Sequence, residues 1–179
     1  MKILAISGSL REASINTALL RAVACLAPAG ITVELYRDLG NLPLFNPDIE
    51  ATDPPVVASL RAKLIASDAV LIASPEYAHG VTGAMKNALD WMVGCEAFVN
   101  KPVGLLNASP RAIHAQASLK ETITVMSGLV IEEASIAVPL LGSSCLNEAD
   151  IVSHPDISRA LREALQALQA ATTQFQARA

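Results

Sequence analysis

Short apolar segments alternate with helical patterns along the whole chain, and this alternation limits the possible folds more than any other feature. Four segments have the length and composition of strands, Lys2–Ser7, Thr32–Tyr36, Asp68–Ser74 and Lys101–Asn107, and Val130–Val138 contains a fifth. A segment with helical character follows each of them. Because parallel neighbouring strands require such crossover connections, the sequence predicts an α/β fold with a five-stranded parallel sheet and helices on both faces.

The predicted helices have recognisable ends. We expect helices over Ser14–Leu26, Pro54–Ser67, Gly83–Val93 and Ile113–Ser127, and a last one from Pro155 onward. Asp53 is the expected N-cap of the second helix, with Pro54 at its first position. The last helix is expected to start from a cap at His154 or Ser153.

Length and composition agree with this fold class. The 179 residues suffice for one domain with a substantial core, and no linker or repeat divides them, so we expect a single domain over residues 1–179. The chain is 52% apolar and 17% charged, as strands covered on both faces require. Its net charge of −4 includes no basic block, which argues against nucleic acid as a partner.

The cysteines and the apolar runs indicate the cellular compartment of the protein and whether it contacts a membrane. Cys25, Cys95 and Cys145 are widely separated and form no CxxC pair. This sparse, odd count is typical of a reducing compartment, and each is expected to be a small core residue. No apolar run approaches the ~20 residues that span a bilayer. We therefore expect a soluble cytoplasmic protein without membrane contact, and no metal-ligand cluster is evident.

A ligand site is expected beyond the carboxyl ends of the strands, where open α/β sheets bind their ligands. The loops there are Ser7–Asn16, Ser74–Gly83 and Ala108–His114. The first connects a strand directly to a helix, whose first N–H groups attract anions. It carries a set of phosphate-binding residue types: Gly8 for a tight turn, Ser9, Ser14 and Asn16 as hydrogen-bond donors, and Arg11 as a planar cation. The alternative is that Ser14 or Asn16 only caps the helix.

Two well-known phosphate motifs are missing from this loop. There is no G-x-x-x-x-G-K-[ST], and therefore no lysine for a triphosphate, and no G-x-G-x-x-G for a pyrophosphate. The remaining hydroxyl-rich cradle is suited to a terminal monophosphate.

The second loop and its helix, SPEYAHGVTGAMKNALDW, complete a resemblance. With the first loop, they resemble the NAD(P)H-dependent FMN reductase family, which includes quinone, azo-dye and chromate reductases. The family pattern is approximately G-S-x-R-x-x-S-x-N, P-E-Y and G-x-x-K-N-A-x-D-W. It is present here as Gly8, Ser9, Arg11, Ser14 and Asn16; Pro75, Glu76 and Tyr77; and Gly83, Lys86, Asn87, Ala88, Asp90 and Trp91.

The resemblance implies a fold, a cofactor and binding residues. The fold is a flavodoxin-like three-layer α/β/α sandwich with strand order 2-1-3-4-5, in chains that form homodimers or homotetramers. The residues implied to bind the FMN phosphate are Ser9, Arg11, Ser14 and Asn16. Pro75, Glu76 and Tyr77 are implied to carry the ribityl chain and the edge of the isoalloxazine. Asn87 and Trp91, in the following helix, are expected to serve packing or a subunit interface.

The third loop departs from the family pattern, because Ser109-Pro110-Arg111-Ala112 replaces a common Gly-Gly pair. Ser109 is a candidate donor to the flavin. Arg111 is a candidate for a dinucleotide phosphate or a second subunit, or it is simply solvated. His79 and His114 are interpreted as hydrogen-bonding loop residues rather than acid–base catalysts.

The function that the resemblance implies is reduction of FMN by NADPH or NADH, followed by transfer of two electrons to quinones, azo compounds, metal oxyanions or free flavin. Hydride transfer needs alignment of the cofactors more than a titrating side chain, so no catalytic residue is assigned. Two alternatives are a flavodoxin-type electron carrier and a non-catalytic flavin or nucleotide-monophosphate binding protein.

Overall fold

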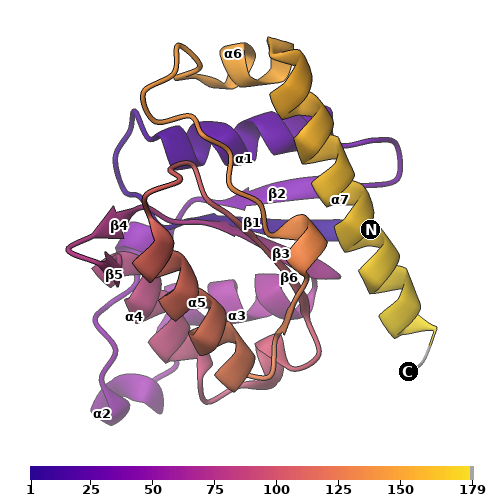
Figure 1. Cartoon of the computed structure of the whole chain (residues 1–179). Helices are drawn as coiled ribbons and strands as arrows, with labels where there is room; N and C mark the ends of the chain where they lie inside the picture. Colours follow the sequence, from indigo (N-terminus) through magenta and orange to yellow (C-terminus); the bar gives the residue numbers. More distant parts are fainter. Residues whose placement is uncertain (178–179) are drawn as a thin grey trace.

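The computed structural model describes residues 1–177, and its centre is a parallel sheet of five strands (Figure 1). The sheet order is β2-β1-β3-β6-β7. These strands are β1 (Lys2–Ser7), β2 (Thr32–Tyr36), β3 (Ala69–Ala73), β6 (Pro102–Leu106) and β7 (Leu129–Val130). With the small hairpin between β3 and β6 left out of the count, this is the predicted order 2-1-3-4-5. The expected flavodoxin-like fold is confirmed.

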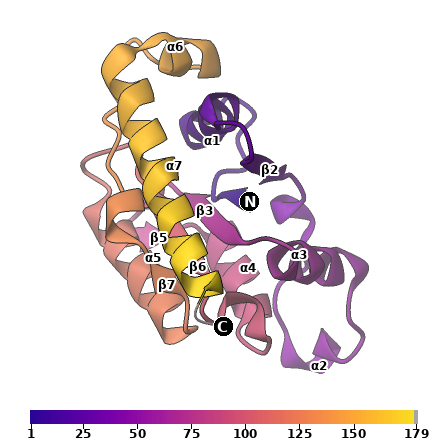
Figure 2. The same ribbon diagram turned by 90° about the vertical axis from the view of Figure 1, so that its right-hand side faces the viewer.

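Seven helices among the described residues surround the sheet. They are α1 (Ile15–Leu26), α2 (Pro47–Glu50), α3 (Pro55–Ile65), α4 (Gly83–Met92), α5 (Ile113–Val125), α6 (Glu148–Ser153) and α7 (Pro155–Gln176). One buried cluster joins α1, α6 and α7 to the sheet through side chains such as Ile3 and Ala5, and the other joins α3, α4 and α5 through Leu4 and Ile6. Alternate residues of β1 therefore point into opposite cores, which makes the three layers seen in Figure 2.

The second predicted helix begins one residue later than expected and lacks the expected cap. Pro54 is the N-cap of α3 and makes no side-chain cap bond. Asp53 has a φ of 43° and forms an ion pair with Arg61 at 2.9 Å, so its carboxylate is directed to the helix side. The cap of α7 is His154, one of the two predicted residues; its Nδ1 accepts from the Ile157 N–H at 3.4 Å.

The fifth strand, β7, overlaps only the beginning of the range expected to contain it, Val130–Val138. After β7 the chain forms a 3-10 turn at Glu132–Ala134 and returns to the sheet only in a bridge between Ala137 and Asn107. The Ser135 hydroxyl accepts the Leu105 N–H at 3.1 Å, in place of a backbone carbonyl. A side chain thus interrupts the ladder, which an apolar, β-branched sequence does not reveal.

The helix after the second loop is held within this chain. Trp91 is buried, and its Nε1 donates to the Pro43 carbonyl at 2.7 Å. Asn87 donates to the same carbonyl at 2.9 Å and accepts the Phe45 N–H at 2.7 Å. Of the two interpretations for these residues, packing describes their contacts.

The cysteines only partly follow the prediction. Cys145 is buried and Cys95 partly so, but Cys25 is exposed, and the expectation that it lies in the core is wrong. Its thiol donates to Glu148 at 2.9 Å, and this hydrogen bond, with burial and the carboxylate charge, raises the pKa of the thiol. No helix within residues 1–177 is long and apolar enough to cross a membrane.

Candidate functional site

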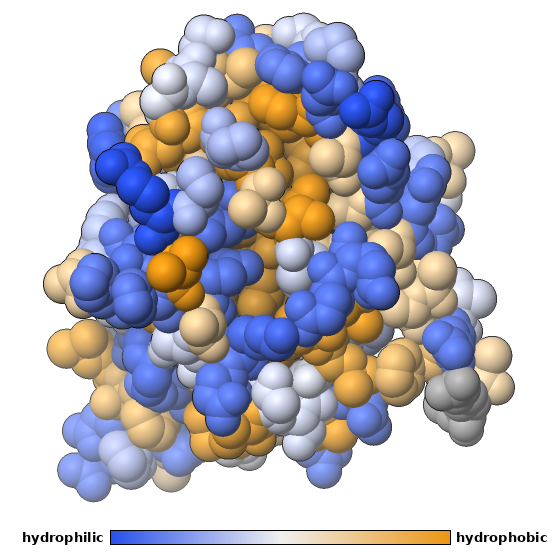
Figure 3. All heavy atoms as spheres, viewed as in Figure 1, coloured by the Kyte–Doolittle hydropathy of each residue, from blue (hydrophilic) through white to orange (hydrophobic). Residues whose placement is uncertain are grey.

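A pocket of about 610 Å³ lies at the carboxyl ends of β1, β3 and β6, where the three polar loops meet. All eight residues that the sequence singled out for the cofactor line it: Ser9, Arg11, Ser14, Asn16, Pro75, Glu76, Tyr77 and Ser109. Figure 3 shows this side of the molecule, where apolar side chains reach the surface among hydrophilic ones. The structure therefore brings together residues that are up to 100 positions apart, but which ligand they bind stays a prediction.

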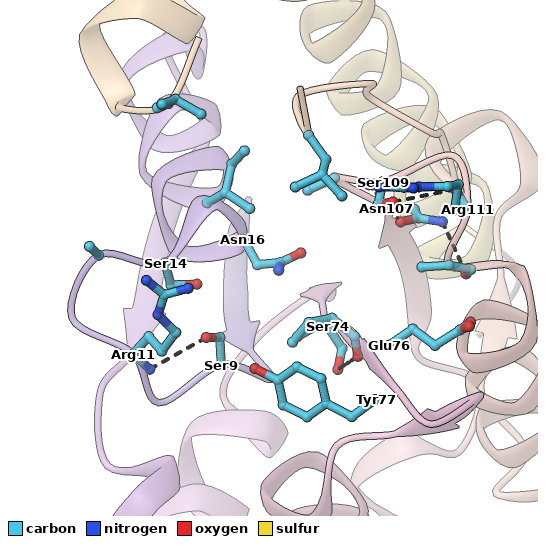
Figure 4. Close-up of a pocket in the computed structure, with 17 residues that line it drawn as sticks. Ser9, Arg11, Ser14, Asn16, Ser74, Glu76, Tyr77, Asn107, Ser109 and Arg111 are labelled. Carbon is cyan, nitrogen blue, oxygen red and sulfur yellow. Dashed lines mark hydrogen bonds between the residues drawn. The ribbon is translucent and has the colours of Figure 1, made fainter. Parts of the chain in front are cut away.

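The first wall of the pocket is the connection from β1 to α1. Ser14 is the N-cap of α1, and its Oγ accepts the Thr17 N–H at 3.2 Å. The Ser9 Oγ accepts the Arg11 N–H at 3.4 Å, as Figure 4 shows. In both cases the hydroxyl oxygen accepts from the backbone, so its own O–H is available to donate to a ligand. Helix capping and ligand binding by Ser14 are thus compatible.

Asn16 and Arg11 have unused hydrogen-bonding capacity at this wall. Asn16 is 5% exposed, and its Oδ1 has no hydrogen-bond partner among the described residues. Burying an amide oxygen without a partner destabilises a protein, unless a ligand completes the bond. The Arg11 guanidinium is exposed and forms no ion pair within residues 1–177. Both groups face the same pocket (Figure 4).

Gly8 joins the first wall to the second. Its N–H donates to the Ala73 carbonyl at 2.8 Å, and the Thr82 hydroxyl donates to its carbonyl at 2.7 Å. A Cβ at this position would lie 2.2 Å from the Ser74 Oγ. The backbone bends at Gly8 directly after β1, as expected, although its φ is not positive. Glycine is needed here because two loops approach closely.

The second wall is a hairpin of β4 (Glu76–Tyr77) and β5 (Gly80–Val81). Tyr77 is 57% exposed, and Figure 4 shows its ring along one side of the pocket with the hydroxyl directed toward Ser9. The Glu76 carboxylate points the other way and accepts the Ala115 N–H at 2.8 Å. Glu76 therefore lines the pocket while its charged group is bonded to α5.

The third wall is the loop after β6, in which Ser109–Ala112 replaces the Gly-Gly pair common in the family. Asn107 holds it: its Oδ1 accepts the Ser109 N–H at 2.9 Å and its Nδ2 donates to the Ala112 carbonyl at 3.2 Å. The Ser109 Oγ accepts the Arg111 N–H at 3.3 Å. Ser109, Arg111 and Ala112 all line the pocket, so the loop reaches the site without a Gly-Gly pair.

Sequence reasoning missed several lining residues. Asn107 had a detectable signal, since it is a polar residue at the end of a buried strand. Leu141 and Leu146 had none, because they follow β7 and belong to no motif. They line the pocket and are 51% and 61% exposed, so they form an apolar edge at its mouth.

The three histidines occupy two different situations. His79 and His114 stack with ring centroids 4.2 Å apart, and neither lines the pocket. They join the hairpin to α5 by ring contact, rather than by the hydrogen bonds expected for them. His154 caps α7, away from the site.

The chemistry of this pocket suits a flat, phosphorylated ligand. One end offers the hydroxyls of Ser9 and Ser14 and the charge of Arg11, and the Glu76 carboxylate at the other side is already bonded. The rest of the lining mixes apolar side chains with backbone and amide groups, as in cofactor sites generally. No cluster of metal-ligating side chains occurs in the part of the chain that the structure describes.

Known proteins share this sequence and this fold. A family model for NADPH-dependent FMN reductase matches residues 1–140. An NAD(P)H-dependent FMN reductase of Pseudomonas aeruginosa is 35% identical over 178 residues, which cover 94% of each chain. A quinone reductase of Pseudomonas putida is 41% identical over 110 residues, or 59% of each chain.

Among solved structures, the flavoenzyme NAD(P)H:(acceptor) oxidoreductase FerB from Paracoccus denitrificans superposes with a TM-score of 0.76 at 25% identity. The match covers 96% of this chain and 97% of FerB. The family model spans most of the chain, and the P. aeruginosa relative matches nearly all of it. This chain therefore belongs to the NADPH-dependent FMN reductase family.

Proposed function

We propose that this protein is an FMN-dependent oxidoreductase that takes a hydride from NADPH or NADH and passes two electrons to a small acceptor. The observation that carries the proposal is the buried Oδ1 of Asn16, which has no hydrogen-bond partner within residues 1–177, beside the exposed guanidinium of Arg11 on the same pocket wall. A flavin mononucleotide offers both kinds of partner, because its ribityl hydroxyls donate hydrogen bonds and its phosphate accepts them. Family membership and the similarity to FerB support the same reading.

The phosphate end would be held by Ser9, Arg11, Ser14 and Asn16. The two serine hydroxyls donate, and the arginine adds a charge-assisted hydrogen bond. Asn16 can offer its Oδ1 to a ribityl hydroxyl or, with the amide turned over, an N–H to the phosphate. The acidic protein as a whole does not attract an anion, so this local set must do so.

The ring end would lie between the hairpin and the loop after β6. Bound FMN supplies the hydride and electron chemistry. Pro75, the backbone of Glu76 and Tyr77 would border the ring from the hairpin, and Ser109 would border it from the loop after β6; all four residues line the pocket. These groups bind and orient a planar ring, which is the protein's share of the work in hydride transfer.

The nicotinamide that donates the hydride and the acceptor that takes up the electrons would enter the same open mouth of the pocket, one after the other. Quinones are the acceptor class that we favour, since Leu141 and Leu146 give the mouth an apolar edge. Azo compounds, metal oxyanions and free flavin remain candidates for the same site. Arg111, on the pocket wall, is the candidate partner for a phosphate of the nicotinamide dinucleotide.

We further propose that residues 1–179 act as one domain, in homodimers or homotetramers. Exposed large apolar side chains such as Leu10, Leu44 and Val93 support contact with a second copy. A cytoplasmic location is supported by three cysteines that form no disulfide.

Anaerobic reduction tests the proposed function. The protein is loaded with FMN, and NADPH or NADH is added while the visible absorption of oxidised flavin is followed. We expect the absorption to bleach and then to return on addition of a quinone. Bound flavin that neither nicotinamide reduces would instead identify an electron carrier, and failure to bind FMN would leave neither reading standing.

A further inference from the structure

We propose that Glu76 is a positioning residue: its carboxylate fastens the β4–β5 hairpin to the start of α5 and so sets the place of Tyr77 over the pocket. The inference deepens the proposed function, on which its consequence for the flavin rests. The sequence resemblance assigned Glu76 to direct cofactor binding. Its carboxylate instead accepts a hydrogen bond from the Ala115 N–H, at 2.8 Å, and therefore contacts α5.

The start of α5 lacks a cap of its own. Its N-cap residue is Ala112, which has no side-chain group to accept a hydrogen bond, and its first turn contains no acidic residue. Ala115 is at the third helical position, whose N–H a capping side chain normally accepts. Glu76 supplies this acceptor from a different element, with a negative charge at the positive end of the helix dipole.

The hairpin depends on outside contacts as well. Each of its strands has only two residues, and an isolated hairpin of this size is not stable in water. Its turn residues, Ala78 and His79, have φ values of 49° and 60°, where a hairpin of this type favours Asn-Gly. A positive φ is unfavourable for residues with a Cβ, so the surrounding contacts must hold this turn in place.

Among the contacts between the hairpin and α5, a side-chain hydrogen bond and a ring stack flank Tyr77. One is the bond from Ala115 to Glu76, directly before Tyr77, and the other is the ring stack of His79 on His114. The Tyr77 side chain itself is 57% exposed, so its own packing does not fix its position. Its place over the pocket follows from the anchored backbone on either side.

The attachment of the hairpin to α5 by the Glu76 carboxylate, here called the clamp, is tested first in the protein without ligand, by amide hydrogen exchange. In Glu76→Ala we expect exchange at Ala115 and at the hairpin amides to become about tenfold to a hundredfold faster, since an acceptor is lost. Glu76→Gln keeps an acceptor oxygen and should stay within about fivefold of the native rates. Glu121→Ala, an exposed glutamate on the same helix, is the matched control and should change neither region.

The consequence for the site is tested with FMN bound. We expect Glu76→Ala to change the visible spectrum of the bound flavin and raise the KM for the acceptor, with both restored in Glu76→Gln. Unchanged exchange in Glu76→Ala, or Glu76→Gln as impaired as Glu76→Ala, would overturn the clamp. Altered exchange with an unaltered flavin spectrum and KM would overturn the positioning role. If no variant binds FMN, the proposed function fails while the exchange data still decide the clamp.

Discussion

The two sides of the pocket are built in different ways. The side formed by Ser7–Asn16 is one continuous connection from β1 to α1, and its polar groups are held by the cap of the helix that follows. The opposite side is assembled from two segments: Glu76 and a histidine stack fasten the hairpin to α5, and Asn107 holds the loop after β6. The first arrangement can be read from adjacent residues. The second depends on contacts between segments that are distant in the sequence.

Arg11→Ala should have the largest effect, because it removes the charged group of the continuous side. We expect FMN binding to weaken by about tenfold to a hundredfold, the range for a charge-assisted hydrogen bond. Isothermal titration calorimetry measures the Kd. Arg21→Ala, an exposed arginine on α1 outside the pocket, is the control. Equal Kd values for the two variants would remove Arg11 from the site.

Gly8→Ala tests the place where the two sides meet. The new Cβ would lie 2.2 Å from the Ser74 Oγ, so we expect a loss of about 1–3 kcal/mol in the free energy of unfolding. Gly83→Ala is the control: nothing lies within 4 Å of its added Cβ, and alanine favours a helix by about 0.5–1 kcal/mol. Urea denaturation measures both. A native-like Gly8→Ala protein would contradict the close approach of the loops.

Asn16→Ala should move stability and affinity in different directions. We expect FMN to bind about tenfold more weakly, as for one lost hydrogen bond to a ligand. The ligand-free protein should keep its stability or gain up to about 1 kcal/mol, because an unpartnered buried oxygen is removed. Thermal unfolding with and without FMN separates the two effects. A ligand-free variant that is clearly less stable would show that Asn16 serves the fold.

Arg111→Ala should have the smallest effect, on the assembled side. An exposed cation contributes little to binding, so we expect the KM for NADPH to rise by about two- to fivefold with kcat unchanged. A rise for NADPH alone points to its 2′-phosphate, and an equal rise for NADH points to the diphosphate. Unchanged KM values for both nicotinamides would return Arg111 to a solvated role.

The same contrast explains how far the sequence could be interpreted. The five-stranded parallel sheet was predictable from strand–helix alternation, and the strand order and the eight selected lining residues from loop motifs that resemble those of a known family. The shortened β7 was not, since it depends on the Ser135 hydroxyl bonding to Leu105. The Glu76 bond to α5 and the apolar edge of Leu141 and Leu146 were equally hidden. Each arises only when distant segments meet.

The helix caps illustrate the limit on a smaller scale. His154 was predicted as one of two candidates for the cap of α7, and its ring does cap it. Asp53 had a suitable residue type and a following proline, yet its carboxylate pairs with Arg61. A cap prediction weighs only neighbouring residues, whereas an arginine two turns along the helix can compete for the same carboxylate.

Comparing FMN with riboflavin, which lacks the phosphate, tests the central claim most directly. The Kd of each ligand is measured for the native protein and for Arg11→Ala. If the phosphate lies at the continuous side, the native protein should prefer FMN strongly, and the substitution should weaken FMN about tenfold or more while leaving riboflavin almost unchanged. Equal losses for the two flavins, or no native preference for FMN, would contradict the placement of the phosphate beside Arg11.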